Sequence, residues 1–511
     1  MTTNLSSEMA GIPVQQILPS AKLIGANHVS ISSCCGHWQD VQPGDVYVAV
    51  IGSEIDGHEF AYEAIEKGAV AVVTERLLAI DAPQILVQDT RRSYGEICHC
   101  LAGAPSQRLK TIGVSGTDGK TVTAHLIQSI LRADQRATGM ISSIEVTAGK
   151  EGHALPNKQI NPPAIAEQLS AMVLGSCSYA IVEIPSMALA NRSLSGVKLD
   201  VAVLTNVRRD PDNCHGNSNN YSRAFLRMLD HLNEGGLAVV NADDPKSHFL
   251  LEKIAHPTLT IGVKQDANVM GKVLQRSNCD QVFTITAGSE SVVIRTAMIG
   301  DQHVYNCLAA AAVGLTLNIN LQTIAKGIEA AGHIAGRMQR IECGQPFGVW
   351  IDSATSATQL ANALRTLRQV VTGKIWCVCS VAEGQSKLQR RMMGEVAQRA
   401  AGQAVITRTS ADPMVDYEPI HQVLDGFDKP ESAQVVPNRF KAIEWVLSRA
   451  KAGDAVLIAG CGERPFALVG ENKWTIADSD VCEAWLYDNS SMLEEKSQAE
   501  VETILDIEDY R

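Results

Sequence analysis

The strongest chemical signal in the sequence is a glycine-rich segment that ends in a basic and a hydroxyl side chain. Gly116-Thr117-Asp118-Gly119-Lys120-Thr121 lies between the apolar run Lys110–Val114, which predicts a strand, and a helical pattern that begins near Thr121. Glycines let backbone N–H groups turn toward an anion, and the helix N-terminus adds the positive end of its dipole. Lys120 is placed to reach terminal phosphates and Thr121 to contact magnesium. We therefore predict a nucleotide site that includes Gly116, Thr117, Gly119, Lys120 and Thr121.

Two features of this segment depart from the general phosphate-loop pattern. The pattern has a glycine five residues before Gly119, where this chain has Val114, so a shorter loop is expected. Asp118 places a carboxylate inside the anion cradle, which weakens phosphate binding unless a cation or hydrogen bond compensates. The alternative is an ordinary glycine turn before a helix, which Gly-Lys-Thr directly after a strand disfavours.

The segments that follow the loop alternate between strands and helices. Apolar runs predict three strands: Tyr179–Glu183, Leu199–Thr205 and Gly236–Asn241. Helical periodicity predicts three helices: Val122–Arg132, Ala164–Leu174 and Tyr221–Leu232. This alternation is typical of a parallel sheet with crossover helices.

The whole chain has the length and pattern of a three-domain α/β protein, because 511 residues exceed a single hydrophobic core. Residues 15–109 predict a small domain, with apolar runs at Asp45–Ile51 and Ala69–Val73 around a helical stretch, Phe60–Lys67. Residues 110–333 form the expected nucleotide domain and end in the helix-rich stretch Val304–Ala331. Residues 334–488 predict a second α/β sheet with four strands: Gly348–Asp352, Ile375–Val378, Ala404–Thr407 and Ala455–Ala459. Residues 489–511 form an acidic tail.

Composition excludes several classes of function. A net charge of −12 argues against nucleic-acid binding, which requires clustered Lys and Arg. None of the 13 cysteines has the C-x-x-C spacing of a zinc site, and unpaired thiols fit a reducing compartment. The first twenty residues lack the pattern of a signal peptide, and no apolar run approaches 18 residues. We expect a cytoplasmic protein with small-molecule partners.

Motifs in order along residues 15–485 resemble the Mur ligases of the MurE type. They are Pro43–Ala49, Asp56–Phe60, Lys67–Val73, Gly116–Thr121, Val182–Ser186, Thr205-Asn206, Asn241–Pro245, Val304–Asn306 and Gly336–Ile341. The resemblance implies an N-terminal domain for a uridine nucleotide, a central domain with a phosphate loop on a parallel sheet, and a Rossmann-like C-terminal domain.

The resemblance also implies a reaction, the ATP-dependent addition of the third amino acid to UDP-N-acetylmuramoyl-dipeptide. A substrate carboxylate attacks the γ-phosphate, and an amine then displaces phosphate from the acyl phosphate. Lys120 and Glu183 would be the catalytic residues, and Thr121 and Glu183 would bind Mg²⁺. Asn306 and Arg337 would contact ATP, with Arg337 also at the hinge into the third domain. Such chemistry depends on positioning and on neutralising charge.

Two central-domain positions differ from the family at its metal site. Pro211 stands where the family has a magnesium-binding histidine, and nearby His215 is more readily a solvated side chain. Phe225 stands where the family has a lysine that is carboxylated to bind metal. No lysine occurs between Lys198 and Lys246, and an arginine such as Arg223 cannot form the carbamate. We expect Phe225 to be a core residue of an amphipathic helix.

The third domain and the sugar-nucleotide site differ in the same way. Asp352–Ala357 lacks the aromatic and imidazole groups of the family motif, and Ser380–Ser386 stands where the family has a glycine- and aspartate-rich loop. The Asp-Asn-Pro-Arg motif that grips diaminopimelate in the family is missing after Thr409. Asn161-Pro162-Pro163 replaces a contact for the sugar nucleotide. Cys461 stands in a loop where the family has lysine, and we expect a buried small residue there rather than a reactive thiol. The amino-acid substrate is therefore not readable.

Three hypotheses follow. The first is an acid–amino acid ligase with impaired activity that binds ATP, Mg²⁺ and a UDP-muramoyl-peptide-like molecule. The second is a catalytically silent paralogue that binds nucleotide and regulates or supports a protein partner. The third is a different amide ligase of the same fold, such as a folylpolyglutamate-synthetase-like enzyme, which the uridine-nucleotide-like first domain disfavours.

Overall fold

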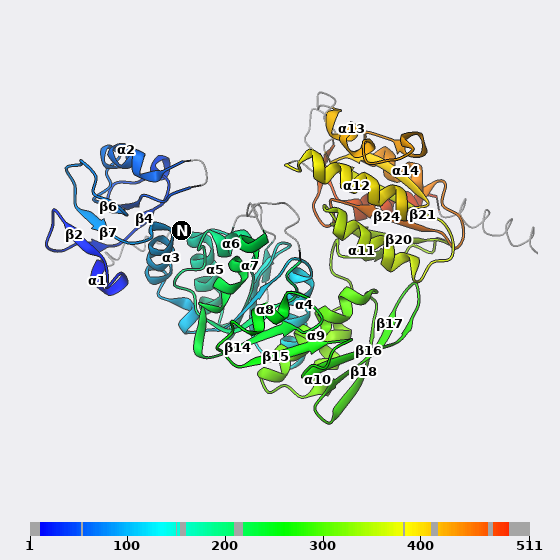
Figure 1. Ribbon diagram of the computed structural model, residues 1–511, viewed down its shortest axis with the longest axis horizontal. Helices are drawn as coiled ribbons and strands as arrows, with labels where there is room; N and C mark the ends of the chain where they lie inside the picture. Colours follow the sequence, from blue (N-terminus) through cyan, green and yellow to red (C-terminus); the bar gives the residue numbers. More distant parts are fainter. Residues whose placement is uncertain are drawn as a thin grey trace, which may run out of the picture. The chain divides into compact units, whose positions relative to one another are not determined.

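The computed structural model describes residues 11–52, 55–149, 151–153, 160–208, 218–381, 384–409, 417–468 and 474–489 (Figure 1). Five positions or segments of the sequence analysis lie outside these residues: Pro211, His215, residues 382–383, residues 410–416 and residues 490–511. The chain divides into two compact units, Met1–Arg208 with His215–Thr260, and Arg209–Cys214 with Ile261–Arg511. Within the described residues, no helix has both the length and the apolar character needed to cross a membrane.

The first unit begins with a small α/β domain. Its five-stranded sheet has the order β2 (Lys22–Ile24), β7 (Gln84–Leu86), β6 (Ala71–Thr74), β5 (Val46–Val48), β4 (Cys34–Cys35), and β1 (Ile12–Pro13) pairs separately with β3 (Ser30–Ile31). Strands β4 to β7 are parallel, and β2 is antiparallel to β7. One face buries Val46 and Val48 with α1 (Val14–Ile17) and α3 (Thr90–Leu101). The other buries Tyr47 with α2 (Ala61–Glu66), as alternating strand residues require.

The central sheet of the first unit carries the predicted crossover pattern. Its strands have the order β11 (Glu151–His153), β10 (Val146–Ala148), β9 (Thr138–Ile141), β12 (Tyr179–Glu183), β8 (Lys110–Ser115), β13 (Leu199–Leu204), β14 (Leu232–Asn241), β15 (Thr258–Gly262). From β9 to β14 all pairings are parallel. The helices are α4 (Lys120–Ala133), α5 (Pro162–Leu174), α6 (Ser186–Ala190), α7 (Ser218–Leu229) and α8 (Ser247–Leu251). The predicted strands and helices are confirmed, except that Leu232 belongs to β14 and pairs with Leu199 rather than ending α7.

The second unit begins with three antiparallel strands that the sequence analysis did not predict. They are β16 (Val269–Arg276), β17 (Gln281–Ala287) and β18 (Glu290–Thr296). Ile261 and Gly262, the residues of β15 that belong to this unit, pair with β16. Two helices follow, α9 (Asp301–Thr316) and α10 (Leu321–Ala330), in the stretch predicted to be helical. Asn318, with φ 58°, ends the first helix, and the Asn320 side chain caps the second.

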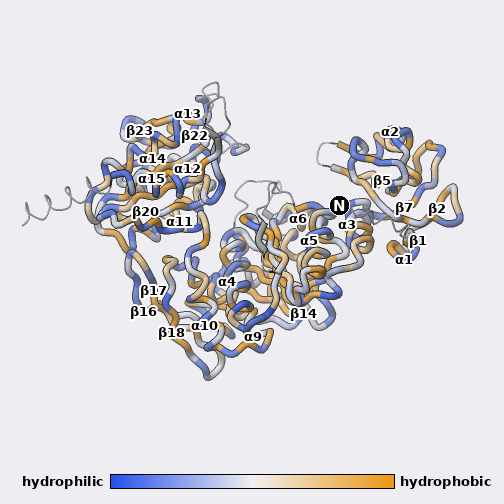
Figure 2. The backbone as a smooth tube through the Cα atoms, turned by 180° about the vertical axis from the view of Figure 1, so that it is seen from behind, coloured by the Kyte–Doolittle hydropathy of each residue, from blue (hydrophilic) through white to orange (hydrophobic). Residues whose placement is uncertain are grey.

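The rest of the second unit is a doubly wound α/β domain. Its sheet has the order β19 (Gln339–Ile341), β20 (Gly348–Asp352), β24 (Ala455–Ala459), β21 (Ile375–Val381), β22 (Gln403–Arg408), β23 (Gln434–Val435). Only β19 is antiparallel. One face packs against α11 (Ala357–Arg368), α12 (Lys387–Ala400) and α13 (Glu418–Leu424), the other against α14 (Arg439–Leu447) and α15 (Asp478–Asp488). Strands β25 (Phe466–Leu468) and β26 (Trp474–Ile476) form a hairpin. Figure 2 shows hydrophobic and hydrophilic stretches alternating along the tube, as amphipathic elements require.

Candidate functional site

The glycine-rich segment forms a tight loop between the carboxyl end of β8 and the start of α4. Gly116 has φ 141°, and Gly119, at the N-cap of α4, has φ 84°. A Cβ at Gly116 would lie 2.0 Å from Thr205 Oγ1, so only glycine fits. Gly119 has no side chain to cap the first turn of α4, which leaves the N–H groups of that turn available to an anion. The predicted glycine turn between a strand and a helix is present, and phosphate binding there stays a prediction.

The end of β13 fixes the shape of this loop. Asn206 accepts hydrogen bonds from Thr117 N through its carbonyl (2.9 Å) and from Asp118 N through its side chain (3.0 Å). Its Nδ2 donates to Asp118 O (3.0 Å), and Thr205 Oγ1 donates to the same carbonyl (2.7 Å). The motif Thr205-Asn206 therefore holds the loop from the neighbouring strand, a role that its spacing in the sequence does not reveal.

The Lys120 ammonium group lies against the loop. Nζ donates to Gly116 O at 2.9 Å and to Thr117 O at 3.0 Å. These carbonyls hold a positive charge where the loop would receive phosphate oxygens, and charge-assisted hydrogen bonds of this kind are strong.

Thr121 and Glu183 meet beside the loop, as the prediction of a shared metal site requires. Thr121 Oγ1 donates to Glu183 Oε1 (2.9 Å), and both residues are buried. Ser143, which the sequence analysis missed, donates its N–H to Glu183 Oε2 (2.8 Å), and its hydroxyl lies 3.0 Å from Thr121 Oγ1. One carboxylate and two hydroxyls are hard oxygen donors, which Mg²⁺ prefers when substrate phosphates complete its shell. The residues therefore fit magnesium, although no three His, Cys, Asp or Glu side chains cluster as a metal site in the described chain.

Asp118 has a cation nearby. Its Oδ2 lies 4.0 Å from Nη1 of Arg208, and the Asp118 side chain is 11% exposed while that of Arg208 is 41% exposed. Arg208 N also donates to Thr117 Oγ1 (3.0 Å). The sequence analysis required a compensating charge for a carboxylate in the anion cradle, and Arg208 supplies it.

Asn306 and Arg337 belong to the second unit, so their predicted contacts with ATP stay predictions. Asn306 is buried in α9 and accepts from Gln302 Nε2 (3.4 Å). Arg337 Nη1 lies 3.6 Å from Glu463 Oε2. Met338 N and Ala354 N both donate to the Asp352 carboxylate at 2.9 Å. Met338, which follows Arg337, is therefore bonded to the last residue of β20.

Comparisons with known proteins agree with this geometry. Family models match in three places: "Mur ligase family, catalytic domain" at residues 29–99, "Mur ligase middle domain" at 114–314 and "Mur ligase, glutamate ligase domain" at 336–462. The chain is 31% identical over 458 residues to the UDP-N-acetylmuramoyl-L-alanyl-D-glutamate–2,6-diaminopimelate ligase of Geobacillus kaustophilus, covering 87% of this chain and 92% of that protein. This chain belongs to the Mur ligase family.

Two solved structures share the fold of this chain. A structure of a UDP-N-acetylmuramoyl-L-alanyl-D-glutamate–2,6-diaminopimelate ligase covers 94% of this chain and 99% of its own, with a TM-score of 0.66 at 22% identity. A Mycobacterium tuberculosis folylpolyglutamate synthase, complexed with ADP and AMPPCP, covers 72% of this chain and 92% of its own, with a TM-score of 0.57 at 18% identity. The fold is shared with both, but only the first extends over nearly the whole of this Mur ligase.

In this Mur ligase, Phe225 is a core residue, as predicted. It is fully buried, and its ring meets Tyr221 edge-on at 5.0 Å between centroids. Tyr221 is also buried, and its hydroxyl lies 2.8 Å from Thr117 Oγ1 in the loop. Phe225, which stands where the resemblance implies a carboxylated lysine, is therefore a packed core side chain.

Cys461 is a buried residue at the end of β24, as predicted. It is 4% exposed, and burial raises the pKa of its thiol above the usual value, which disfavours a reactive thiolate.

The motif Asp352–Ala357 forms hydrogen bonds within the first turn of α11. Ser356 caps this helix, and Thr355 N donates to Gln359 Oε1 at 3.1 Å.

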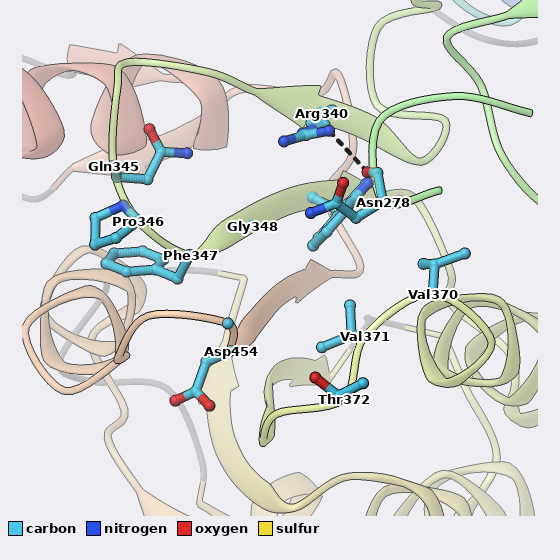
Figure 3. A pocket seen from close by; sticks show the side chains of 12 residues that line it. Asn278, Arg340, Gln345, Pro346, Phe347, Gly348, Val370, Val371, Thr372 and Asp454 are labelled. Carbon is cyan, nitrogen blue, oxygen red and sulfur yellow. Dashed lines mark hydrogen bonds between the residues drawn. The ribbon is translucent and has the colours of Figure 1, made fainter. Parts of the chain in front are cut away.

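A cavity of about 240 Å³ lies at the amino ends of strands in the C-terminal sheet (Figure 3). Arg340 lines it and donates to Asn278 O at 2.8 Å. Asp454 accepts from Lys374 N (2.8 Å) and Trp376 Nε1 (3.0 Å). Ligands of open α/β sheets bind at the carboxyl ends of the strands, so this cavity is not the predicted site.

Proposed function

We propose that this chain is an ATP-dependent acid–amino acid ligase of peptidoglycan-precursor synthesis, located in the cytoplasm. Its substrate would be a UDP-N-acetylmuramoyl-dipeptide, to which it adds a third residue. The observation that carries the proposal is the contact of Thr121, Glu183 and Ser143 beside a loop that holds the Lys120 ammonium. The names of the relatives, which are ligases acting on UDP-N-acetylmuramoyl-L-alanyl-D-glutamate, support the substrate class.

Each part of the loop has a distinct task in this proposal. The N–H groups at the start of α4 and the Lys120 ammonium bind and orient the phosphates, and Lys120 offsets the charge that spreads over the transferring group. Thr121 and Glu183 would hold magnesium, which would neutralise negative charge on the phosphates. Asn206 keeps the loop in place, so less reorganisation is needed when the nucleotide binds.

We further propose that turnover is slower than in relatives with the carboxylated lysine. Phe225 is an uncharged side chain buried in the core, so it adds no metal-binding oxygen near the transferring phosphate. A matched assay measures ADP release with UDP-N-acetylmuramoyl-dipeptide and a panel of amino acids, for this chain and for the Geobacillus relative. Product formation that requires both substrates and Lys120 supports the ligase, and a rate equal to that of the relative contradicts the impairment.

The second candidate is a silent paralogue that binds nucleotide without turnover. The burial of Phe225 favours it, because this side chain packs in the apolar core and offers no group that could bind a metal ion. Calorimetric binding of magnesium-ATP, together with no acyl phosphate and no amide product for any amino acid, would select this candidate over the ligase.

A further inference from the structure

A second cavity, in the first unit, is lined mainly by charged side chains. Its volume is about 310 Å³, and it lies where α3, the segment after α6 and the end of α7 meet. Its charged lining consists of four basic residues and two acidic ones: Arg92, Arg192, Lys198 and Arg227, with Glu96 and Asp230. The positive groups come from three separate elements and outnumber the negative ones, which makes the cavity attractive to an anion.

Two of the four cations are already neutralised. Arg92 Nε lies 2.7 Å from Glu96 Oε1, and Arg192 Nε lies 2.7 Å from Asp89 Oδ2. The other two have no such partner: within the described chain, neither Lys198 nor Arg227 forms an ion pair with a carboxylate. Arg227 is half-buried and donates through Nη1 to Ala190 O at 2.7 Å, the carbonyl that ends α6. A half-buried guanidinium has five donors, and one carbonyl satisfies few of them.

His231 adds a neutral polar group to the lining. Its Nδ1 lies 3.1 Å from Val197 O, so Nδ1 carries the proton and Nε2 is an acceptor while the ring is neutral. Burial lowers the pKa of His231, and Lys198 and Arg192 add to this effect. While it is neutral the ring adds no charge, and Asp230 offsets part of the positive charge of Lys198 and Arg227.

We propose that this cavity is a binding site for a phosphate-bearing anion. A phosphate group offers several acceptor oxygens and a negative charge that matches a guanidinium and an ammonium. The cavity is separate from the phosphate loop, because the two share no residue. The proposal is independent of the proposed ligase activity.

The experiment uses titration calorimetry of the full chain with inorganic phosphate, pyrophosphate and uridine monophosphate. Lys120→Ala first weakens binding at the phosphate loop. In this background we expect saturable pyrophosphate binding that Arg227→Gln with Lys198→Gln weakens at least tenfold. The matched control, Arg132→Gln with Lys253→Gln, removes two exposed positive charges elsewhere in the same unit and should change affinity less than twofold.

The proposal is overturned if the Lys120→Ala chain binds no anion, or if the double variant binds as tightly as its background. Lys198→Gln alone serves if Arg227→Gln does not fold, because Lys198 is exposed, and it should still weaken binding several-fold. Equal affinity for phosphate and uridine monophosphate identifies the free phosphate group as the ligand. Clearly tighter binding of the nucleotide identifies a phosphate that belongs to a larger molecule.

Discussion

The phosphate loop and the helix face that carries Phe225 lie in the same compact unit, but they have opposite chemistry. At the loop, the Lys120 ammonium donates to backbone carbonyls, and Thr121 donates to Glu183. Asn206 and Ser143 support this arrangement. On α7, Phe225 is enclosed by apolar side chains, and the Tyr221 hydroxyl contacts the loop. The loop keeps polar groups beside the predicted nucleotide site, whereas Phe225 offers only apolar packing. In the proposed ligase, nucleotide binding would therefore depend on the loop, and Phe225 would contribute stability rather than a metal ligand.

The largest expected effect comes from removing the buried ring. Phe225→Ala should lower the free energy of unfolding by about 3–5 kcal/mol, because it leaves a cavity in the core. Arg223→Ala, an exposed change on the same helix, should have little effect. Urea unfolding followed by circular dichroism measures both, and a loss below about 1 kcal/mol for Phe225→Ala would mean that the ring is not packed as described.

The second-largest expected effect concerns nucleotide binding at the phosphate loop. Lys120→Ala should weaken magnesium-ATP binding roughly 10- to 100-fold, because hydrogen bonds to a charged group are worth about 1.5–3 kcal/mol. Its unfolding free energy should stay close to that of the parent chain. Lys110→Ala, an exposed lysine before the same loop, is the control. Equal ATP affinity in the two variants would contradict a nucleotide site at this loop.

The third expected effect is a pH dependence of the unfolding free energy that comes from the buried His99. Burial lowers the pKa of His99 to about 4, and the ring bonds to Ser106 Oγ at 2.9 Å. Because this pKa is below the unfolded value, protonation favours unfolding, so the stability is present above pH 6.5 and is lost as pH falls toward 4. Between those limits, His99 should account for about 2 kcal/mol.

The matched variants are His99→Gln and, for an exposed histidine, His28→Gln. Thermal unfolding from pH 7.5 to 4.5 should show a flatter stability profile for His99→Gln, while His28→Gln follows the parent chain. Parallel profiles for all three proteins would exclude His99 as the titrating group.

The smallest expected effect lies within the loop. Asp118→Asn should raise the affinity for magnesium-ATP about two- to fivefold by removing a negative charge near phosphate, and Arg208→Gln should lower it by a similar factor. Their separation of 4.0 Å predicts that the two changes are not additive. A double-mutant cycle by calorimetry measures the coupling, and strict additivity would show that Arg208 does not offset Asp118.

The local features of this protein are readable from the amino-acid sequence. The spacing of Gly116–Thr121, the strand Tyr179–Glu183 and the apolar stripe that buries Phe225 depend on neighbours within a few residues, so periodicity and turn chemistry were enough to predict them. Buried residues alternate with half-buried ones in β17 and with exposed ones in β18. A search of this stretch for a period of two residues is therefore the way in which the sequence analysis could have predicted both strands.

Contacts between residues that are distant in the sequence depend on the order of the strands and the packing of the helices. Ser143 reaches Glu183 because β9 lies beside β12, and Asn206 reaches the loop because β13 lies beside β8. Arg227 and Lys198 share a cavity because α7 packs against α6 and the segment that follows it. Strand order and helix packing are set by the burial of whole faces, which no single stretch of sequence contains.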